Sequence, residues 1–466
     1  MKATTTAWLT LLTSLVSHPQ HLAADPVEHL ADAIRIPTIS YQDREKIDYE
    51  AFKQFHQFLL RTYPTVFEEL PAETIGQYSL LFTWPGRDSN LKPVLFDSHY
   101  DVVPVEPGTE GEWTHPPFGG VIADGYLWGR GTLDDKSSVI ATLEAMNGLL
   151  KEGFQPTRTL LFSFAHDEEI GGRDGAANLA ARIEERGITL EYMIGEGGQV
   201  VEDSPFTPGK TMAMVALAEK TYVTLTLRAR GDGGHSSMPV TNNAVVNLAR
   251  AVAALHDNPF EPELVPPVTS MIEAIGDHSS GIQGFLMRNQ SLFSAVIASN
   301  MAKDSFSNAM VRSTTAVTMF SAGIKENVIP QQAEAKVNFR LLPGVTPEQL
   351  MADVTAIIAS PNIEIETSNW GSGLPVTGIN GAGYQHLSAA ISEVLPDVAI
   401  IPGLLVASTD ARHYRNLTDN NYRFHTYSLA MADSGTIHGT NERTSLEGVK
   451  RSVELSTALI RRVGDN

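Results

Sequence analysis

Three short apolar runs, each ending abruptly in histidine or acidic residues, mark the first half of the chain. They read "PVLFDSH" from Pro93, "TLLFSFAHDEE" from Thr159 and "EYMIGEGG" from Glu191. Uninterrupted apolar runs of this length are typical of parallel strands that are buried on both faces. The polar residues therefore gather at the carboxyl ends of neighbouring strands, which is the edge where open α/β sheets bind ligands.

Helical patterns separate these three runs. After the first run, the residues Val139, Leu143, Met146 and Leu150 recur at helical spacing and would form one apolar face. After the second run, "GAANLAARIEERG" predicts a helix that ends at Gly187. This alternation predicts an α/β fold with a mostly parallel central sheet flanked by helices.

The pattern changes near Lys220. "TYVTLTLRARG" alternates as a half-exposed strand does, and it is followed by two helical patterns and the strand patterns "TTAVTMFSAG", "AEAKVNFRLLPG" and "IEIETSNWG". We therefore expect residues 220–371 to form a smaller α+β domain inserted into the first domain, which would comprise residues 25–219 and 372–466. The segment between the proline-rich stretch "NPFEPELVPPVTS" and Arg312 shows no pattern that assigns it.

Composition excludes several classes of protein. A length of 466 residues is too long for a single core, and the net charge of −20 argues against nucleic acid or an anionic membrane as a partner. Cysteine is absent, which rules out disulfides, thiolate nucleophiles and sulfur-ligated zinc, so any metal must bind to His, Asp and Glu. A serine hydrolase is disfavoured because the chain has no G-x-S-x-G motif.

Residues 1–24 resemble a secretory signal peptide. They contain Lys2, an apolar stretch over residues 7–16 and a pair of alanines at the end. The alternative is the beginning of an ordinary N-terminal helix. We favour a secreted or periplasmic protein over a cytoplasmic one, and no later segment has the apolar length that crosses a bilayer.

Histidine and acidic residues at the predicted strand ends and turns form a candidate metal site. His99 and Asp101 stand two apart at the end of the first strand, so Asp101 can orient the imidazole, with a structural hydrogen bond as the alternative. Asp134 follows the glycine-rich turn "GRGTLDD", where helix capping is the alternative. The second strand ends in the pair Glu168 and Glu169. Adjacent side chains point to opposite sides, so one can bind a metal and the other can act as a general base, unless both belong to a solvated acidic loop.

Two further candidates complete this set. Glu196 follows the third strand in "GEGG", and His438 lies in "IHGTNE", where a surface histidine is the alternative. Two divalent ions and a bridging hydroxide would balance three carboxylates, which avoids the cost of buried net charge. Oxygen and nitrogen ligands suit zinc. The candidate ligands are His99, Asp134, Glu169, Glu196 and His438.

Several motifs resemble those of a known family. "HYDVVP", "GRGTLDDK", "HDEE", "GEGG", "ENVIP", "NFRLLPG" and "IHGTNE" stand in the order found in the co-catalytic di-zinc metallopeptidase family of aminoacylases, glutamate carboxypeptidases, succinyl-diaminopimelate desuccinylases and carnosinases. The resemblance runs from about Pro26 to the C-terminus. "AIRIPTIS" and "STDARHYRNLT" resemble the branch that contains carboxypeptidase S and the secreted N-acyl-amino-acid hydrolases. Tyr100 and Gly195 depart from the usual pattern of the family.

The resemblance implies a role for each candidate. His99 and Glu196 would bind one zinc ion, Glu169 and His438 the other, and Asp134 would bridge the two. Cobalt or manganese could replace zinc. Asp101 would orient His99, and Glu168 would be the general base. The peptide bond between Asp134 and Asp135 would be cis.

The resemblance also implies that residues 220–371 are a lid that carries the contacts of a homodimer. His235 in "GDGGHSSMP" would stabilise the oxyanion, in many members of the family by reaching across to the partner subunit. Asn327 and Arg340 would hold substrate. Arg340 and Arg412 are both candidates for binding a substrate carboxylate, with surface salt bridges as the alternative.

The hypothesis from the sequence is a zinc-dependent hydrolase for a small substrate with a free carboxylate. The substrate would be a peptide C-terminus, a dipeptide or an N-acyl amino acid, and a metal-bridging hydroxide would attack its amide bond with Glu168 as general base. The alternative is an exported solute-binding protein without catalysis, which would need no acidic metal cluster.

Overall fold

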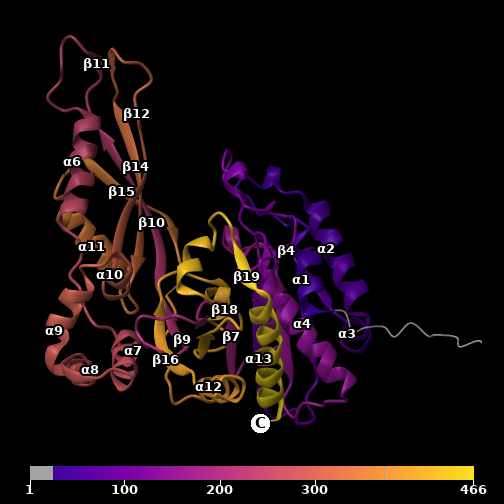
Figure 1. Cartoon of the computed structure of the whole chain (residues 1–466). Coiled ribbons are helices and arrows are strands. Elements are labelled where there is room, and N and C mark those ends of the chain that lie inside the picture. Colours follow the sequence, from indigo (N-terminus) through magenta and orange to yellow (C-terminus); the bar gives the residue numbers. More distant parts are fainter. Residues whose placement is uncertain (1–24, 372, 466) are drawn as a thin grey trace, which may run out of the picture.

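The computed structural model describes residues 25–371 and 373–465, and the expected signal peptide, residues 1–24, lies outside them. A ten-stranded sheet runs through the larger part of the molecule (Figure 1). Its order is β1-β2-β6-β3-β7-β17-β9-β8-β18, and β16 pairs with β9. The strands are β1 (Glu73–Ile75), β2 (Ser79–Trp84), β3 (Val94–His99), β6 (Leu160–Ala165), β7 (Tyr192–Gly195), β8 (Val200–Val201), β9 (Met212–Glu219), β16 (Ala399–Leu405), β17 (Asn421–Arg423) and β18 (Ser428–Leu429).

The centre of this sheet is parallel. β3 is parallel to both β6 and β7, β17 is parallel to β7, and β16 is parallel to β9. Antiparallel pairing occurs between β1 and β2, between β2 and β6, and where β9 meets β8 and β17. The α/β fold with a mostly parallel central sheet, as predicted from the sequence, is confirmed.

Side chains of β3 and β6 enter two different cores. Phe96 and Phe162 stack at 5.1 Å between ring centroids in the larger core, whereas Leu95 and Leu161 face α5 (Ala176–Glu185) in a smaller core. Burial on both faces explains why these strands read as uninterrupted apolar runs. The helices on the larger core are α1 (Pro26–Ile34), α2 (Tyr49–Thr62), α3 (Pro64–Glu69), α4 (Lys136–Lys151), α12 (Ala382–Val394) and α13 (Leu446–Asp465).

A second, four-stranded antiparallel sheet forms the part at the upper left of Figure 1, which we call the lid. Its order is β12 (Thr314–Ala322), β14 (Gln332–Leu341), β10 (Thr221–Arg230) and β15 (Ile363–Trp370). One face packs on α6 (Ala244–Asp257) and α11 (Pro347–Ile358) through a core of its own. This separate core supports the proposal that residues 220–371 form a distinct domain. At the far tip, β11 (Gly234–His235) pairs with β13 (Val328–Ile329).

The segment that the sequence left unassigned is helical. It forms α7 (Pro266–Asp277), α8 (Gly281–Arg288), α9 (Gln290–Met301) and α10 (Ser305–Val311). Val268 and Ile272 of α7 share a core with Ile401 and Leu404 of β16, so this segment packs against the central sheet. A separate small sheet has the order β19 (Arg443–Ser445), β5 (Tyr126–Trp128) and β4 (Val121–Ala123). Among the described residues, none of the helices combines the length and apolar character needed to cross a bilayer.

Candidate metal centre

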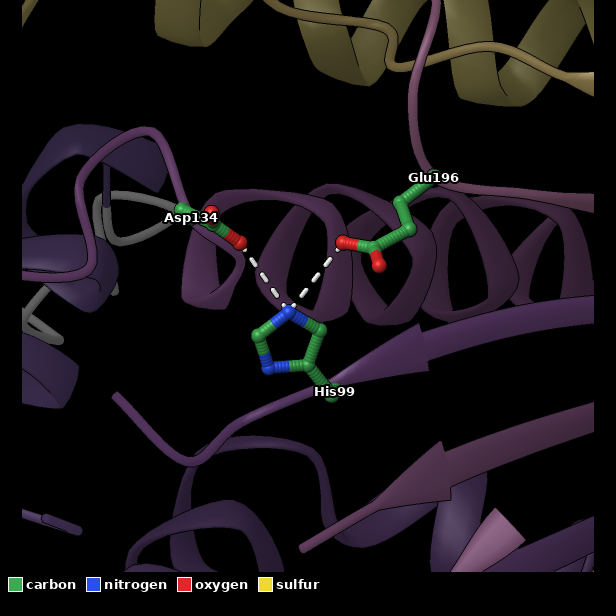
Figure 2. Close-up of side chains that lie close together, drawn as sticks. All are labelled: His99, Asp134 and Glu196. Atoms are coloured by element: carbon green, nitrogen blue, oxygen red, sulfur yellow. Dashed lines mark hydrogen bonds and ion pairs between the residues drawn. The ribbon is translucent and has the colours of Figure 1, made fainter. Parts of the chain in front are cut away.

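Three side chains from separate segments converge at the carboxyl edge of the central sheet (Figure 2). His99 is the last residue of β3, Glu196 comes directly after β7, and Asp134 lies in the turn before α4. Nε2 of His99 lies 3.0 Å from Oδ1 of Asp134 and 3.2 Å from Oε2 of Glu196. Because the ends of β3 and β7 meet at one edge of the sheet, residues almost a hundred positions apart become neighbours.

Asp134 also belongs to a second group, with Glu169 and His438. Glu169 lies in η3 (Glu168–Ile170), the helical turn after β6, and His438 lies just before β19. Nε2 of His438 is 3.0 Å from Oδ2 of Asp134 and 3.3 Å from Oε1 of Glu169. The two carboxylate oxygens of Asp134 therefore face different histidines, which is the arrangement that a carboxylate shared by two cations requires.

The donor atoms of both groups fit divalent metal ions. Within each group they lie within 4.8 Å of one another. All are imidazole nitrogens or carboxylate oxygens, which zinc accepts. Oε1 of Glu169 is buried and makes no well-aligned hydrogen bond, although His438 is within ion-pair distance. Burying a carboxylate oxygen without a hydrogen-bond donor destabilises the folded protein unless a positive charge lies next to that oxygen.

The electrostatics of the two groups also favour bound cations. Close contact with the carboxylates of Asp134 and then of Glu169 raises the pKa of His438 to about 10. Burial is the largest single influence on His99 and disfavours its imidazolium form, but the charge of Glu196 and the interactions with Asp101 and Asp134 together outweigh burial, so the pKa of His99 lies well above its ordinary value. Three carboxylates exceed the charge that two protonated imidazoles can balance, whereas two divalent ions would supply enough positive charge to offset them.

Asp101 contacts residues of both metal-binding groups. One of its carboxylate oxygens lies 3.3 Å from Nδ1 of His99, and its backbone oxygen lies 3.1 Å from the same nitrogen. Its carboxylate also accepts the backbone N–H groups of Glu168, at 3.1 Å, and Glu169, at 3.2 Å. Asp101 is thus placed to orient the imidazole and to fix the turn that carries both glutamates.

Glu168 is half-buried beside the two groups. Burial raises its pKa well above the usual value, and the charges of Glu196 and Asp410 raise it further. A carboxylate with a raised pKa is a stronger base than an ordinary carboxylate, which suits a general base.

Arg340 lies within electrostatic reach of this glutamate, and Arg412 lies within reach of Arg340. Burial lowers the pKa of Arg340, Arg412 lowers it as well, and Glu168 opposes them. Arg340 belongs to β14 of the lid, and its guanidinium stacks on the ring of Tyr222 at 4.6 Å. Arg412 belongs to η4 (Asp410–Tyr414), in the larger part of the molecule, and its guanidinium lies 3.7 Å from Asp410. The two candidates for binding a carboxylate therefore come from opposite sides of the junction between lid and central sheet.

His235 and Asn327 lie elsewhere, at the tip of the lid (Figure 1). His235 is exposed, and its Nδ1 lies 2.7 Å from the hydroxyl of Ser237. The backbone oxygen of Asn327 accepts the N–H of Ser236 at 3.1 Å, so these two predicted residues are close to each other. Within one chain, however, the structure does not bring them to the metal-binding groups.

Two buried residues in contact with the site were not assigned a role from the sequence. The carboxylate of Asp135 lies 3.3 Å from the backbone N of His99 and 3.2 Å from Nδ1 of His425. Nε2 of His425 lies 4.0 Å from Oε2 of Glu196. The peptide bond before Asp135 is cis, as the resemblance implies. The adjacent acids in the sequence were a signal for Asp135, whereas His425 follows the short strand β17, whose sequence carries no motif that marks the histidine.

Comparisons with known proteins agree with this geometry. The sequence pattern of peptidase family M20/M25/M40 matches residues 95–462. The chain is 38% identical over 440 residues to a probable carboxypeptidase S-like protein of Dictyostelium discoideum, covering 93% of this chain and 84% of the relative. It is 37% identical over 439 residues to an N-fatty-acyl-amino acid synthase/hydrolase of Xenopus tropicalis, covering 93% and 85%.

Solved structures show the same fold. An M20 family metallo-carboxypeptidase from Sulfolobus solfataricus superposes with a TM-score of 0.68 at 18% identity, covering 94% of this chain and 99% of the other. A dinuclear metal-binding M20 peptidase from Bacillus subtilis superposes with a TM-score of 0.58 at 13% identity, covering 94% and 97%. Taken with the matches to carboxypeptidase S-like and N-acyl-amino-acid hydrolase relatives, these findings establish that the chain is a metallopeptidase-type enzyme that belongs to peptidase family M20/M25/M40.

Proposed function

We propose that this protein uses two zinc ions to hydrolyse an amide bond next to a free carboxylate, in an N-acyl amino acid, a dipeptide or the C-terminus of a peptide. The observation that carries the proposal is the carboxylate of Asp134, whose two oxygens each lie 3.0 Å from a different histidine. Membership of a metallopeptidase family favours this reaction over the alternative of a solute-binding protein.

The metal ions would be held by the two groups that share Asp134. His99 and Glu196 would complete one site, and Glu169 and His438 the other. When bound, two divalent ions lower the pKa of a water molecule towards about 7 and polarise the carbonyl group of an amide. Cobalt and manganese would substitute for zinc because they accept the same nitrogen and oxygen donors.

Glu168 would move the proton. Its raised pKa allows it to accept a proton from the attacking water and then to donate that proton to the departing nitrogen. The turn that carries it is held by Asp101, which accepts the backbone N–H of Glu168. The neighbouring Glu169 faces the second metal-binding group, so the two adjacent acids divide the tasks of base and ligand.

Arg340 and Arg412 would bind the carboxylate of the substrate. Guanidinium groups bind carboxylates through paired, charge-assisted hydrogen bonds. The relatives are named for carboxypeptidase and N-fatty-acyl-amino acid hydrolase activities. Both kinds of substrate carry a carboxylate close to the scissile amide, so N-acyl amino acids and peptides both belong in the first assays.

A second copy of the chain would complete the site with His235 and Asn327. Both lie at the exposed tip of the lid, away from the metal-binding groups of their own chain. β12 is an edge strand of the lid sheet, and it exposes Val317, Met319 and Phe320. An edge strand with exposed apolar side chains is a ready surface for pairing with another chain. In the dimer, His235 would donate a hydrogen bond to the oxyanion in the partner subunit.

The test is an assay of the full chain, with zinc or cobalt supplied, against N-acyl amino acids of short and long acyl chains and against dipeptides. Each compound has a matched control in which a carboxamide replaces the carboxylate. We expect at least one class to be hydrolysed, activity to vanish on chelation and return with zinc, and the carboxamides to have a much higher KM. Turnover that survives complete removal of metal would overturn the proposal.

A further inference from the structure

The buried carboxylate of Glu442 accepts several backbone hydrogen bonds from the turn that contains Asp134. Oε1 of Glu442 accepts the backbone N–H groups of Gly131 at 3.0 Å, Leu133 at 2.8 Å and Asp134 at 3.3 Å. The backbone oxygen of Glu442 in turn accepts the N–H of Gly129 at 2.9 Å. Glu442 is fully buried. The turn before α4 is thus attached to a residue more than three hundred positions away.

Arg130, in the same turn, extends the connection to the loop of His438. One end of its guanidinium donates to Oε2 of Glu442. The other donates to the backbone oxygens of His438 at 3.1 Å and Gly439 at 3.0 Å. The guanidinium also lies over the indole ring of Trp113 at 5.5 Å. Arg130 is 2% exposed, so water competes little with these contacts.

These contacts meet a specific need of the second metal-binding group. His99 and Glu196 are placed by β3 and β7, whereas Asp134 and His438 lie in irregular backbone. His438 has a positive φ of 59°, a conformation that a residue with a side chain adopts only when its surroundings hold it there. Residues that orient metal ligands from behind commonly decide the affinity of a site.

We propose that Arg130 and Glu442 are positioning residues that hold the turn of Asp134 and the loop of His438 in register. They thereby set the affinity of the Asp134–Glu169–His438 group for its metal ion. The inference rests on the proposed function, because it assumes that this group binds a metal. It predicts an asymmetry, since the group that contains His99 and Glu196 depends on strands and needs this support less.

The variants that test the inference are Glu442→Gln and Arg130→Lys. Glu442→Gln keeps a hydrogen-bond acceptor but removes the charge that pairs with Arg130. Arg130→Lys keeps the positive charge but removes the planar guanidinium group, which donates to several acceptors at once. Glu219→Gln is the matched control, because Glu219 forms an equally buried ion pair with Arg423, at 2.8 Å. The control lowers stability by the same means without touching either loop.

The measurement is a titration of each metal-free full-length protein with Co²⁺, followed by optical absorption and calorimetry, together with the melting temperature of each metal-free protein. We expect one of the two binding events to weaken about 10- to 100-fold in both variants, and both events to be unchanged in the control. Wild-type affinity for both ions in Arg130→Lys and Glu442→Gln would overturn the inference while leaving the proposed function intact. So would an equal loss in the control. Absence of Co²⁺ binding by the wild type would overturn both.

Discussion

The metal centre and the tip of the lid contrast sharply. At the metal centre, five segments of one chain bring their side chains close together, and all of them except that of His438 are buried or half-buried. At the tip, His235 lies beside Ser237, Asn327 accepts the backbone N–H of Ser236, and His235 is exposed. The two regions nevertheless carry residues that the family resemblance assigns to one reaction.

The difference follows from how each region is stabilised. Three of the five candidate ligands, His99, Glu169 and Glu196, end or follow strands that are buried in the cores of the central sheet, so folding of that sheet brings them to one edge. The tip consists of the two-stranded pair β11 and β13, which has no core of its own. In the function that we propose, one chain would therefore build its metal site alone, whereas a residue at the tip would need a partner subunit to reach a reacting atom.

The largest effect is expected from Glu168→Gln, which separates catalysis from metal binding within the first region. Removing a general base lowers kcat by about 10²- to 10⁴-fold, whereas the zinc content should equal that of the wild type. Kinetics and elemental analysis on the same preparation measure both. Glu169→Gln is the control and should lose metal. Loss of metal in Glu168→Gln instead would mean that the two adjacent glutamates have the opposite roles.

His235→Ala tests the second region. Loss of one hydrogen-bond donor to an oxyanion costs about 10²- to 10³-fold in kcat, and KM and zinc content should change little because the residue is far from its own metal centre. Steady-state kinetics with a hydrolysed substrate provide the measurement. A kcat close to that of the wild type would show that His235 at the tip takes no part in catalysis.

Mixing two inactive variants tests whether the two regions meet across a dimer. A hybrid dimer of His235→Ala and Glu168→Gln has one complete site, so random exchange of subunits should restore about a quarter of the wild-type activity. Each variant mixed with itself is the control. If the mixture stays as inactive as its components while subunits are shown to exchange, His235 does not act across the interface.

Met319→Glu is expected to have a smaller effect that follows protein concentration. Met319 is 64% exposed on the edge strand β12, so the substitution should change the stability of one chain by no more than about 0.5 kcal/mol. A charge there should oppose association of two acidic chains, and activity should fall in proportion to the fraction of monomer. Light scattering and activity at matched concentrations measure this. Unchanged mass and activity would place the interface elsewhere.

A further prediction concerns stability rather than activity, and it involves Lys220, which lies between β9 of the central sheet and β10 of the lid. Burial, and then the charge of Arg340, lower its pKa from 10.5 to about 7, although its Nζ donates to the backbone oxygens of Ala309 and Arg312. The unfolded chain therefore binds more protons between these pKa values, and this residue's contribution to stability should rise with pH by up to about 1.4 kcal/mol per unit. The melting temperature of the wild type, relative to that of Lys220→Met, should increase between pH 7 and pH 9. Parallel curves would contradict this.

The central sheet could be predicted because strands buried on both faces leave an uninterrupted apolar signal. The same runs end at His99, Glu168 and Glu196, which made the candidate site visible. In contrast, α9 has no clear apolar face, and a kink at Phe293 interrupts it, so the segment around it could not be assigned. The roles that we propose for Arg130 and Glu442 depend on contacts with backbone groups, which leave no spacing pattern in a sequence.

The position of His235 illustrates a different limit. Its motif and the resemblance suggested a role in the reaction, but only the fold shows that the residue lies at an exposed tip far from the metal-binding groups of the same chain. Sequence spacing carries no information about which copy of a chain supplies a residue. The structure turns this question into the subunit-mixing experiment above.

The most direct test of the account is the metal content of the purified wild type and of Asp134→Ala, measured by elemental analysis after removal of loosely bound metal. The account predicts about two zinc ions per chain in the wild type, because one carboxylate faces both groups, and loss of both ions when that carboxylate is removed. Glu196→Ala, which affects one group only, should lose one. A wild type that binds a single ion, or an Asp134→Ala variant that keeps both, would contradict the claim of a shared dinuclear site.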